Sequence, residues 1–313
     1  MHRKFSATPA MEKTIRHATS IILAGLVLAG LSATAIADDR QSAQPVDVAF
    51  VLDQLATDEY SAALPPLSPD EFELLQTGEP VIKVPQATGS ESDDEVSAFG
   101  IFGLKIVDAP RLLVWSTVMG AASEPHVRLT RAYISRLEKG AYVRYQHINL
   151  PWPVRDRHWV ILCEKNLDLA NASNGGIWQH RWTLHQDGPQ LLRDAHADGR
   201  IDGLSEKDLE NAVYLPANRG AWTLAELGDG KTLVIGYFDA SFGGLLPGMI
   251  VRSFTRRQMR AGLTLIEDLT GRVHLEYDGE PQIHDGHGLP ILQQDVLRLA
   301  QHRDASGQHT ADE

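Results

Sequence analysis

The sequence predicts an α+β fold in which a curved antiparallel sheet packs against one long C-terminal helix. Strand-like segments separated by tight turns fill most of the chain from residue 96 to residue 240. No long crossover helix separates them, so neighbouring strands are expected to run antiparallel. Residues 246–269 have the hydrophobic period of a single amphipathic helix, and the sheet is the available partner for its apolar face.

The N-terminus has the organisation of a Sec signal peptide. Four basic residues precede an uncharged stretch from Ala18 to Ala37, which ends in the small residues Ala35-Ile36-Ala37. We therefore predict that residues 1–37 are a cleaved leader, with Met11 as an alternative start, and that the protein is periplasmic or secreted. An uncleaved N-terminal membrane anchor is the alternative, because about 20 uncharged residues can span a bilayer.

Charge and cysteine content exclude some classes of function. The formal net charge is −12, so attraction to a phosphate backbone is absent and nucleic acid is not an expected partner. Cys163 is the single cysteine, which rules out a disulfide within the chain. It lies in an apolar strand and is expected to be a small buried hydrophobic residue.

The remaining segments are read in order along the chain. Residues 38–77 are an N-terminal extension with two short helices, 46–55 and 69–76, the second capped by Ser68. A helix over 109–119, a short helix over 204–211 and a tail, 272–313, with a helix over 292–299 complete the helical segments. The expected strands are 81–84, 96–107, 129–137, 141–149, 157–166, 176–184, 220–227 and 231–239, with tight turns at Lys139-Gly140 and Asp229-Gly230.

The C-terminal helix has an apolar face and a basic face. Ile250, Phe254 and Leu265 fall on the apolar side. Arginines recur at the spacing i, i+4, i+8 on roughly the opposite side, which permits transient contact with an anionic membrane surface. A solvated face paired with acidic residues is the alternative. These arginines are Arg252, Arg256 and Arg260.

Four segments in order resemble the START domain family. Residues 150–160, LPWPVRDRHWV, are similar to the motif that opens a START strand, and 243–251, GGLLPGMIV, to the turn that opens the last helix. Between them, residues 220–224 and 232–237 resemble the last two strands. The resemblance covers roughly Val81 to Leu269. It departs from the family at Arg157-His158, where the family has Arg-Asp, and an acid stands instead at Asp156.

The resemblance implies a helix-grip fold over residues 78–271, in which sheet and C-terminal helix enclose a hydrophobic tunnel. A START-like domain implies binding, and in some members transfer, of a lipid, a sterol-like or another apolar molecule. Polyketide aromatase/cyclases share this fold, so the fold alone does not determine the function. A cyclase-like enzyme in the same cavity and a ligand-free structural or interaction domain are the alternatives.

Alternation along residues 176–184 selects the first ligand-binding candidates. Trp178, His180 and Trp182 fall on one face of this strand and would line an apolar cavity with a few hydrogen-bond donors. Filling of the core by these side chains is the alternative. Arg157 is a candidate for a ligand head group or for bracing the sheet corner. The full ligand-binding set is Tyr145, Arg157, Trp159, Trp178, His180, Trp182, Trp222, Tyr237, Leu246, Ile250 and Phe254.

No catalytic constellation, cofactor or metal site is predicted. No serine lies in a G-x-S-x-G elbow. His274, His284 and His287 fit no compact zinc spacing. We therefore expect a binding protein and no enzyme.

Overall fold

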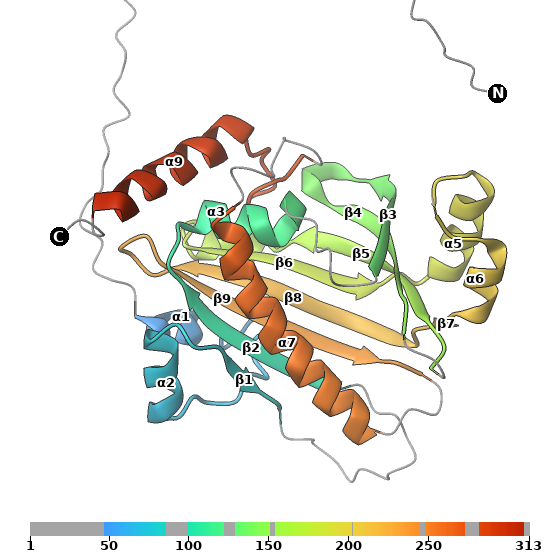
Figure 1. Cartoon of the computed structure of the whole chain (residues 1–313), viewed down its shortest axis with the longest axis horizontal. Coiled ribbons are helices and arrows are strands. Elements are labelled where there is room, and N and C mark those ends of the chain that lie inside the picture. The colour runs from blue at the N-terminus through green and yellow to red at the C-terminus, as the bar shows by residue number, and fades with distance from the viewer. Residues whose placement is uncertain are drawn as a thin grey trace, which may run out of the picture. The chain divides into compact units, whose positions relative to one another are not determined.

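A nine-stranded antiparallel sheet forms the centre of the fold (Figure 1). The computed structural model describes residues 47–85, 99–121, 129–150, 154–201, 203–243, 248–272 and 282–309. The predicted leader, residues 1–37, and the candidate Leu246 lie outside these ranges. Strand order is β1-β2-β9-β8-β6-β5-β4-β3, and the short β7 pairs with β5 in parallel.

The strands are close to the segments that the alternation predicts. β1 is Val81–Lys83, β2 Phe99–Val107, β3 Leu129–Arg136, β4 Tyr142–Ile148, β5 Arg157–Lys165, β6 Ile177–Leu184, β7 Val213–Tyr214, β8 Ala217–Glu226 and β9 Thr232–Ser241. Lys139 and Gly140 have positive φ at the β3–β4 turn, as do Asp229 and Gly230 at the β8–β9 turn. Both tight turns therefore lie where the sequence predicts them, and the α+β fold class is confirmed.

One face of the sheet packs against α7, Gly248–Thr270, and is called the α7 face here. Gly103 of β2 is its closest point of approach, because a Cβ there would lie 2.5 Å from Met259 and 2.8 Å from Leu263. Lys105 adds an ion pair with Glu267, at 3.0 Å. The helix α3, Arg111–Ser116, and the C-terminal helix α9, Gln293–His309, bury side chains in the same core.

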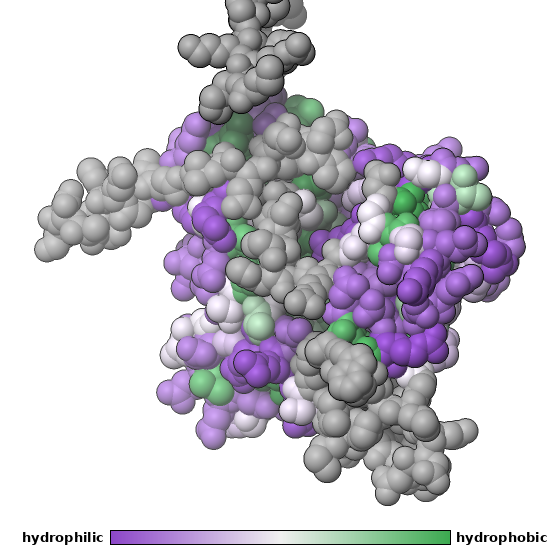
Figure 2. All heavy atoms as spheres, turned by 45° about the vertical axis from the view of Figure 1, so that its right-hand side comes forward, coloured by the Kyte–Doolittle hydropathy of each residue, from purple (hydrophilic) through white to green (hydrophobic). Residues whose placement is uncertain are grey.

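The opposite face, called the α1 face here, is covered by other helices. α1, Val48–Gln54, and α2, Pro69–Gln76, pack on its β2 and β9 side, where Phe102 stacks on Tyr237 with ring centroids 4.6 Å apart. α5, Gly188–Ala197, covers its β4 and β5 side through Leu192. The neighbouring α6 is Glu206–Asn211. Figure 2 shows a mostly hydrophilic outer surface over α5 and α6.

Several helices differ from their predicted extent. The segment predicted as a helix over 109–119 is α3 followed by a π-helical turn, Thr117–Ala121, with Gly120 at φ 113°. α4, Leu167–Ala172, and α5 were not predicted. The tail also contributes to the core, because Ile283, Ile291 and Val296 are buried against α3 and α7.

Candidate functional site

A continuous row of rings crosses the α7 face from β3 to β9. Successive ring centroids lie 5.0–6.3 Å apart, which is the range for favourable aromatic contacts. Most of these rings are only half-buried, whereas the hydrophobic residues beneath α7 on β2 are fully buried. We call this set the aromatic row: Tyr133, Tyr142, His180, Trp182, Phe238 and Trp222.

Two glycines let the indoles lie flat on the sheet. A Cβ on Gly220 would be 2.3 Å from the Trp182 ring, and a Cβ on Gly236 would be 2.6 Å from the Trp222 ring. The Trp182 indole nitrogen donates to Asn218 Oδ1 at 3.0 Å, so the polar end of this ring is satisfied. What the row presents to the space above it is therefore mainly apolar ring surface.

A buried amine lies beside the row. Lys165, at the end of β5, is 7% exposed, and its Nζ lies 3.3 Å from His180 Nδ1 and 3.1 Å from Met119 Sδ. Burial lowers its pKa to about 7. The pKa of His180 is held well below its ordinary value, first by burial and then by the nearby cations Lys165 and Arg144.

His180 connects this amine to the phenol of Tyr142. The Tyr142 hydroxyl lies 3.2 Å from His180 Nε2, and burial raises the pKa of Tyr142. Tyr142, His180 and Lys165 thus form one chain of polar contacts at the β3–β4 end of the row. These three groups could exchange protons, and they could also hold one polar group of a ligand.

A small cavity opens at the same end. Its volume is about 50 Å³, far below the roughly 300–1,000 Å³ of pockets that enclose a drug-sized molecule. It has room for a small polar group and no room for a hydrocarbon chain. Its lining comes from the π-helical turn, from β3 to β5, and from residues 282–284 of the tail, and includes Tyr133, Arg136, Tyr142, Lys165 and His284.

Five sequence-predicted ligand residues lie on the α7 face. His180, Trp182 and Trp222 belong to the aromatic row itself. Trp159 is half-buried beside it, with its indole nitrogen donating to Gln146 at 3.0 Å. Trp178 lies at the other end of β6, where the Arg111 guanidinium stacks 4.1 Å from its ring. Ligand contact by each of them stays a prediction.

Arg157 braces the chain that precedes α7. Its guanidinium donates to the carbonyls of Phe242 at 2.6 Å and Gly243 at 3.0 Å, and also to those of Arg155 and Asp156. This is the local bracing role that the sequence offered as one of two alternatives. These hydrogen bonds connect Arg157, at the start of β5, to the chain that follows β9.

Tyr145 and Tyr237 lie on the α1 face, away from the aromatic row. Tyr145 is buried beneath α5, and Tyr237 stacks between Phe102 and Tyr60. The period of two along each strand places Tyr142 and Phe238 on the α7 face in their stead. The structure therefore does not bring these two tyrosines together with the other candidates.

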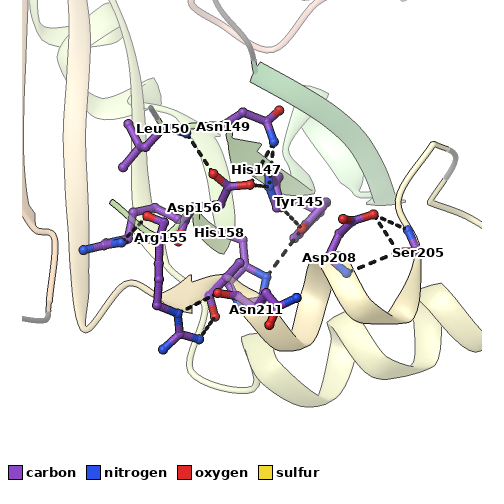
Figure 3. A network of polar contacts seen from close by, with 12 residues as sticks. Tyr145, His147, Asn149, Leu150, Arg155, Asp156, His158, Ser205, Asp208 and Asn211 are labelled. Atoms are coloured by element: carbon purple, nitrogen blue, oxygen red, sulfur yellow. Dashed lines mark hydrogen bonds and ion pairs between the residues drawn. The ribbon is translucent and has the colours of Figure 1, made fainter. Parts of the chain in front are cut away.

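Figure 3 shows a second polar cluster, which surrounds Tyr145. Its hydroxyl lies 3.1 Å from His147 Nδ1 and 3.4 Å from His158 Nδ1. Asp156 lies 3.2 Å from His147 Nε2 and accepts from the backbone of Leu150 at 2.8 Å. Burial lowers the pKa of His158 to about 4. Because Tyr145 and His147 are fully buried, we interpret this cluster as a connection between β4, β5 and the segment that joins them.

The candidates on α7 can be placed only in part. Ile250 and Phe254 belong to α7, but their side chains, like that of Arg252, are outside the described set. Arg256 and Arg260 are exposed. None of the helices in the described ranges combines the length and hydrophobicity needed to cross a membrane. Within those same ranges, no three His, Cys, Asp or Glu side chains are grouped as metal ligands.

Sequence reasoning missed Lys165, Arg144 and Tyr142. A signal for Lys165 existed, because it continues the alternation of Trp159, Ile161 and Cys163 along one strand. A charged residue at a strand end is ordinarily expected in solvent, so this position was not selected.

Comparisons with known proteins return matches among solved structures alone. No family model matches the sequence, and no curated protein matches it. Human STARD10 has 13% identity and a TM-score of 0.48, covering 74% of this chain and 83% of that one. Human StAR-related lipid transfer protein 5 has 14% identity and a TM-score of 0.46, covering 72% and 95%. A STAR-related lipid transfer protein from Xanthomonas axonopodis has 16% identity and a TM-score of 0.45, covering 66% and 97%.

Proposed function

We propose that this protein binds a hydrophobic ligand between the α7 face of the sheet and helix α7. The observation that carries the proposal is the aromatic row, because four of its six rings are only half-buried and so offer apolar surface that the described part of α7 does not fully cover. Burial of a ligand's apolar surface there would contribute about 25 cal/mol per Å². Neighbours named as lipid transfer proteins agree with this class of ligand.

In the proposed mode, the ligand lies along the aromatic row and α7 shifts to admit it. α7 packs mainly on β1, β2 and α3, which leaves the β4, β5, β6 and β8 side to the guest. Gly243, with φ at 62°, precedes the helix and can act as its hinge. Transfer between membranes, with contact through Arg256 and Arg260, and export through the predicted leader stay predictions.

Quenching of tryptophan fluorescence by a brominated ligand tests the proposal. Methyl 9,10-dibromostearate is expected to quench the purified protein saturably, and methyl stearate to reverse the quenching by competition. In the double variant Trp182→Phe, Trp222→Phe the quenched fraction should fall, because these two indoles lie in the row. Absence of quenching by the ester and by other brominated apolar probes would contradict ligand binding.

An acid–base enzyme in the same site is the second candidate, favoured by the chain from Tyr142 through His180 to Lys165. Mass spectrometry of the ligand recovered from the protein separates the two candidates. A binding protein returns the ligand with unchanged mass and isomeric form. A product that disappears in the variant His180→Asn would favour the enzyme.

A further inference from the structure

The cavity at the β3–β4 end of the aromatic row has a basic lining. Arg136, Lys165 and His284 contribute to it, and Tyr133 and Tyr142 add two phenols, while none of the described residues that line it is an Asp or a Glu. Asp285 is a carboxylate whose charge raises the pKa of Lys165. Its Oδ1 already accepts from the backbone nitrogens of His287 and Leu289, each at 2.9 Å.

Lys165 has contacts that do not neutralise an ammonium. The atoms within hydrogen-bond distance of Nζ are a thioether sulfur and an imidazole nitrogen, and the Trp115 ring lies 5.0 Å away. A buried cation is unfavourable unless an anion or several acceptors accompany it. An anion in this cavity would therefore stabilise the charged form of Lys165.

A second cation lies next to the same phenol. The Arg144 guanidinium lies 5.4 Å from the Tyr142 ring, and its Nε is buried without a hydrogen-bond partner. Arg144 is also close enough to depress the pKa of both Lys165 and His180. A buried cation and a half-buried one thus lie at the same end of the row, and neither has an ion pair with a described carboxylate.

We infer that the cavity beside Lys165 receives the anionic end, a carboxylate or phosphate, of an amphiphilic ligand whose hydrocarbon part lies along the aromatic row. The inference rests on the proposed function and adds the chemistry of the head group and the direction in which the ligand lies. The volume of about 50 Å³ fits such a group and excludes the chain. Arg136, with its guanidinium 4.7 Å from the Tyr133 ring, lines the same cavity.

The test compares two brominated probes that share a hydrocarbon chain and differ in the head group, an ionised carboxylate or its uncharged methyl ester. 9,10-Dibromostearic acid, ionised at pH 8, should bind the wild type at least about tenfold more tightly than its methyl ester, a difference typical of one charge-assisted hydrogen bond. Lys165→Met should remove most of this difference, because it should weaken binding of the acid far more than binding of the ester. Arg136→Gln, at an exposed position, should reduce it in part.

Lys207→Met is the matched control, because Lys207 is exposed on α6 and lies outside the cavity lining. Equal affinity of acid and ester in the wild type would overturn the head-group inference while the proposed function stands. If neither probe binds, the proposed function itself fails. Acetate should not displace the acid; if it did so at equal concentration, the cavity would be a free-anion site and the amphiphile would be the wrong ligand.

Discussion

The two faces of the sheet are both covered by helices, but they differ in how completely their groups are partnered. On the α1 face, Gln179 donates to Asp58 at 2.8 Å and to Thr223 at 3.0 Å, deep among packed side chains. On the α7 side, Arg144, Trp178 and Arg111 each have a buried nitrogen without a partner. A folded chain ordinarily satisfies such atoms, and the proposed ligand site on the α7 face would account for the contrast.

The test with the largest expected effect on stability removes one aromatic ring from each face of the sheet. Phe102→Ala should lower the free energy of unfolding by about 3–5 kcal/mol, because Phe102 is fully buried and stacked on Tyr237. Phe238→Ala should cost clearly less, because this ring is half-buried in the aromatic row. Urea unfolding of both variants measures the difference. Equal losses would mean that the α7 face is packed as tightly as the other.

The second test fills a glycine beneath the row. A Cβ on Gly220 would lie 2.4 Å from the backbone oxygen of Tyr237 as well as against Trp182, and a backbone atom cannot move aside easily. Gly220→Ala should therefore cost about 1–3 kcal/mol. The control is Gly262→Ala in α7, where a Cβ meets nothing within 4 Å and should add about 0.5–1 kcal/mol. Thermal unfolding measures the loss of stability in both variants. A larger loss for Gly262→Ala than for Gly220→Ala would contradict close packing of the Trp182 indole on Gly220.

The third test uses the pH dependence of stability. The pKa of Lys165 falls from its ordinary 10.5 to about 7, first because of burial and then because of Arg144, with Cys163 and Asp285 opposing. Between these pH values the unfolded chain holds a proton that the folded chain lacks. The free energy of unfolding should therefore rise with pH, by at most about 1.4 kcal/mol per unit.

Lys165→Met should remove this slope and be more stable than the wild type near pH 7, where the lysine disfavours folding most. Urea unfolding from pH 7 to pH 10 measures the two slopes, with Lys207→Met expected to follow the wild type. Parallel slopes for all three proteins would show that Lys165 is charged and well accommodated. In that case other groups of the protein would already compensate the charge of Lys165, and a ligand anion would not be needed.

Local chemistry let the sequence predict most of the fold. Ser68 caps α2 through a capping box with Glu71, so the predicted helix Pro69–Gln76 has the observed bounds. The alternation of Trp178, His180 and Trp182 likewise placed these residues together on one face. What alternation could not decide was which face of β4 and β9 meets α7. Because helices cover both faces of the sheet, both faces of these strands carry hydrophobic residues in the sequence. Only the tertiary packing shows that Tyr145 and Tyr237 lie on the α1 face and Phe238 on the α7 face.

The buried cations could not be predicted for a related reason. A lysine or arginine in a strand is ordinarily read as solvent-facing, and the energy of burying one depends on groups distant in sequence. Lys165 meets Met119 and the tail residue His284 in one cavity lining. Such a meeting depends on the π-helical turn after α3 and on the return of the tail, neither of which has a local signal.

The return of the tail has a consequence for biosynthesis. His284 lies over Gly140, where a Cβ would be 2.5 Å from its ring, and its carbonyl accepts from Trp115 at 2.8 Å. The wall of the head-group cavity is thus supplied by residues that the ribosome adds long after the strands they close. A sheet that forms before the tail docks has this end open, and its lysine acquires its dry surroundings only when residues 282–284 are in place.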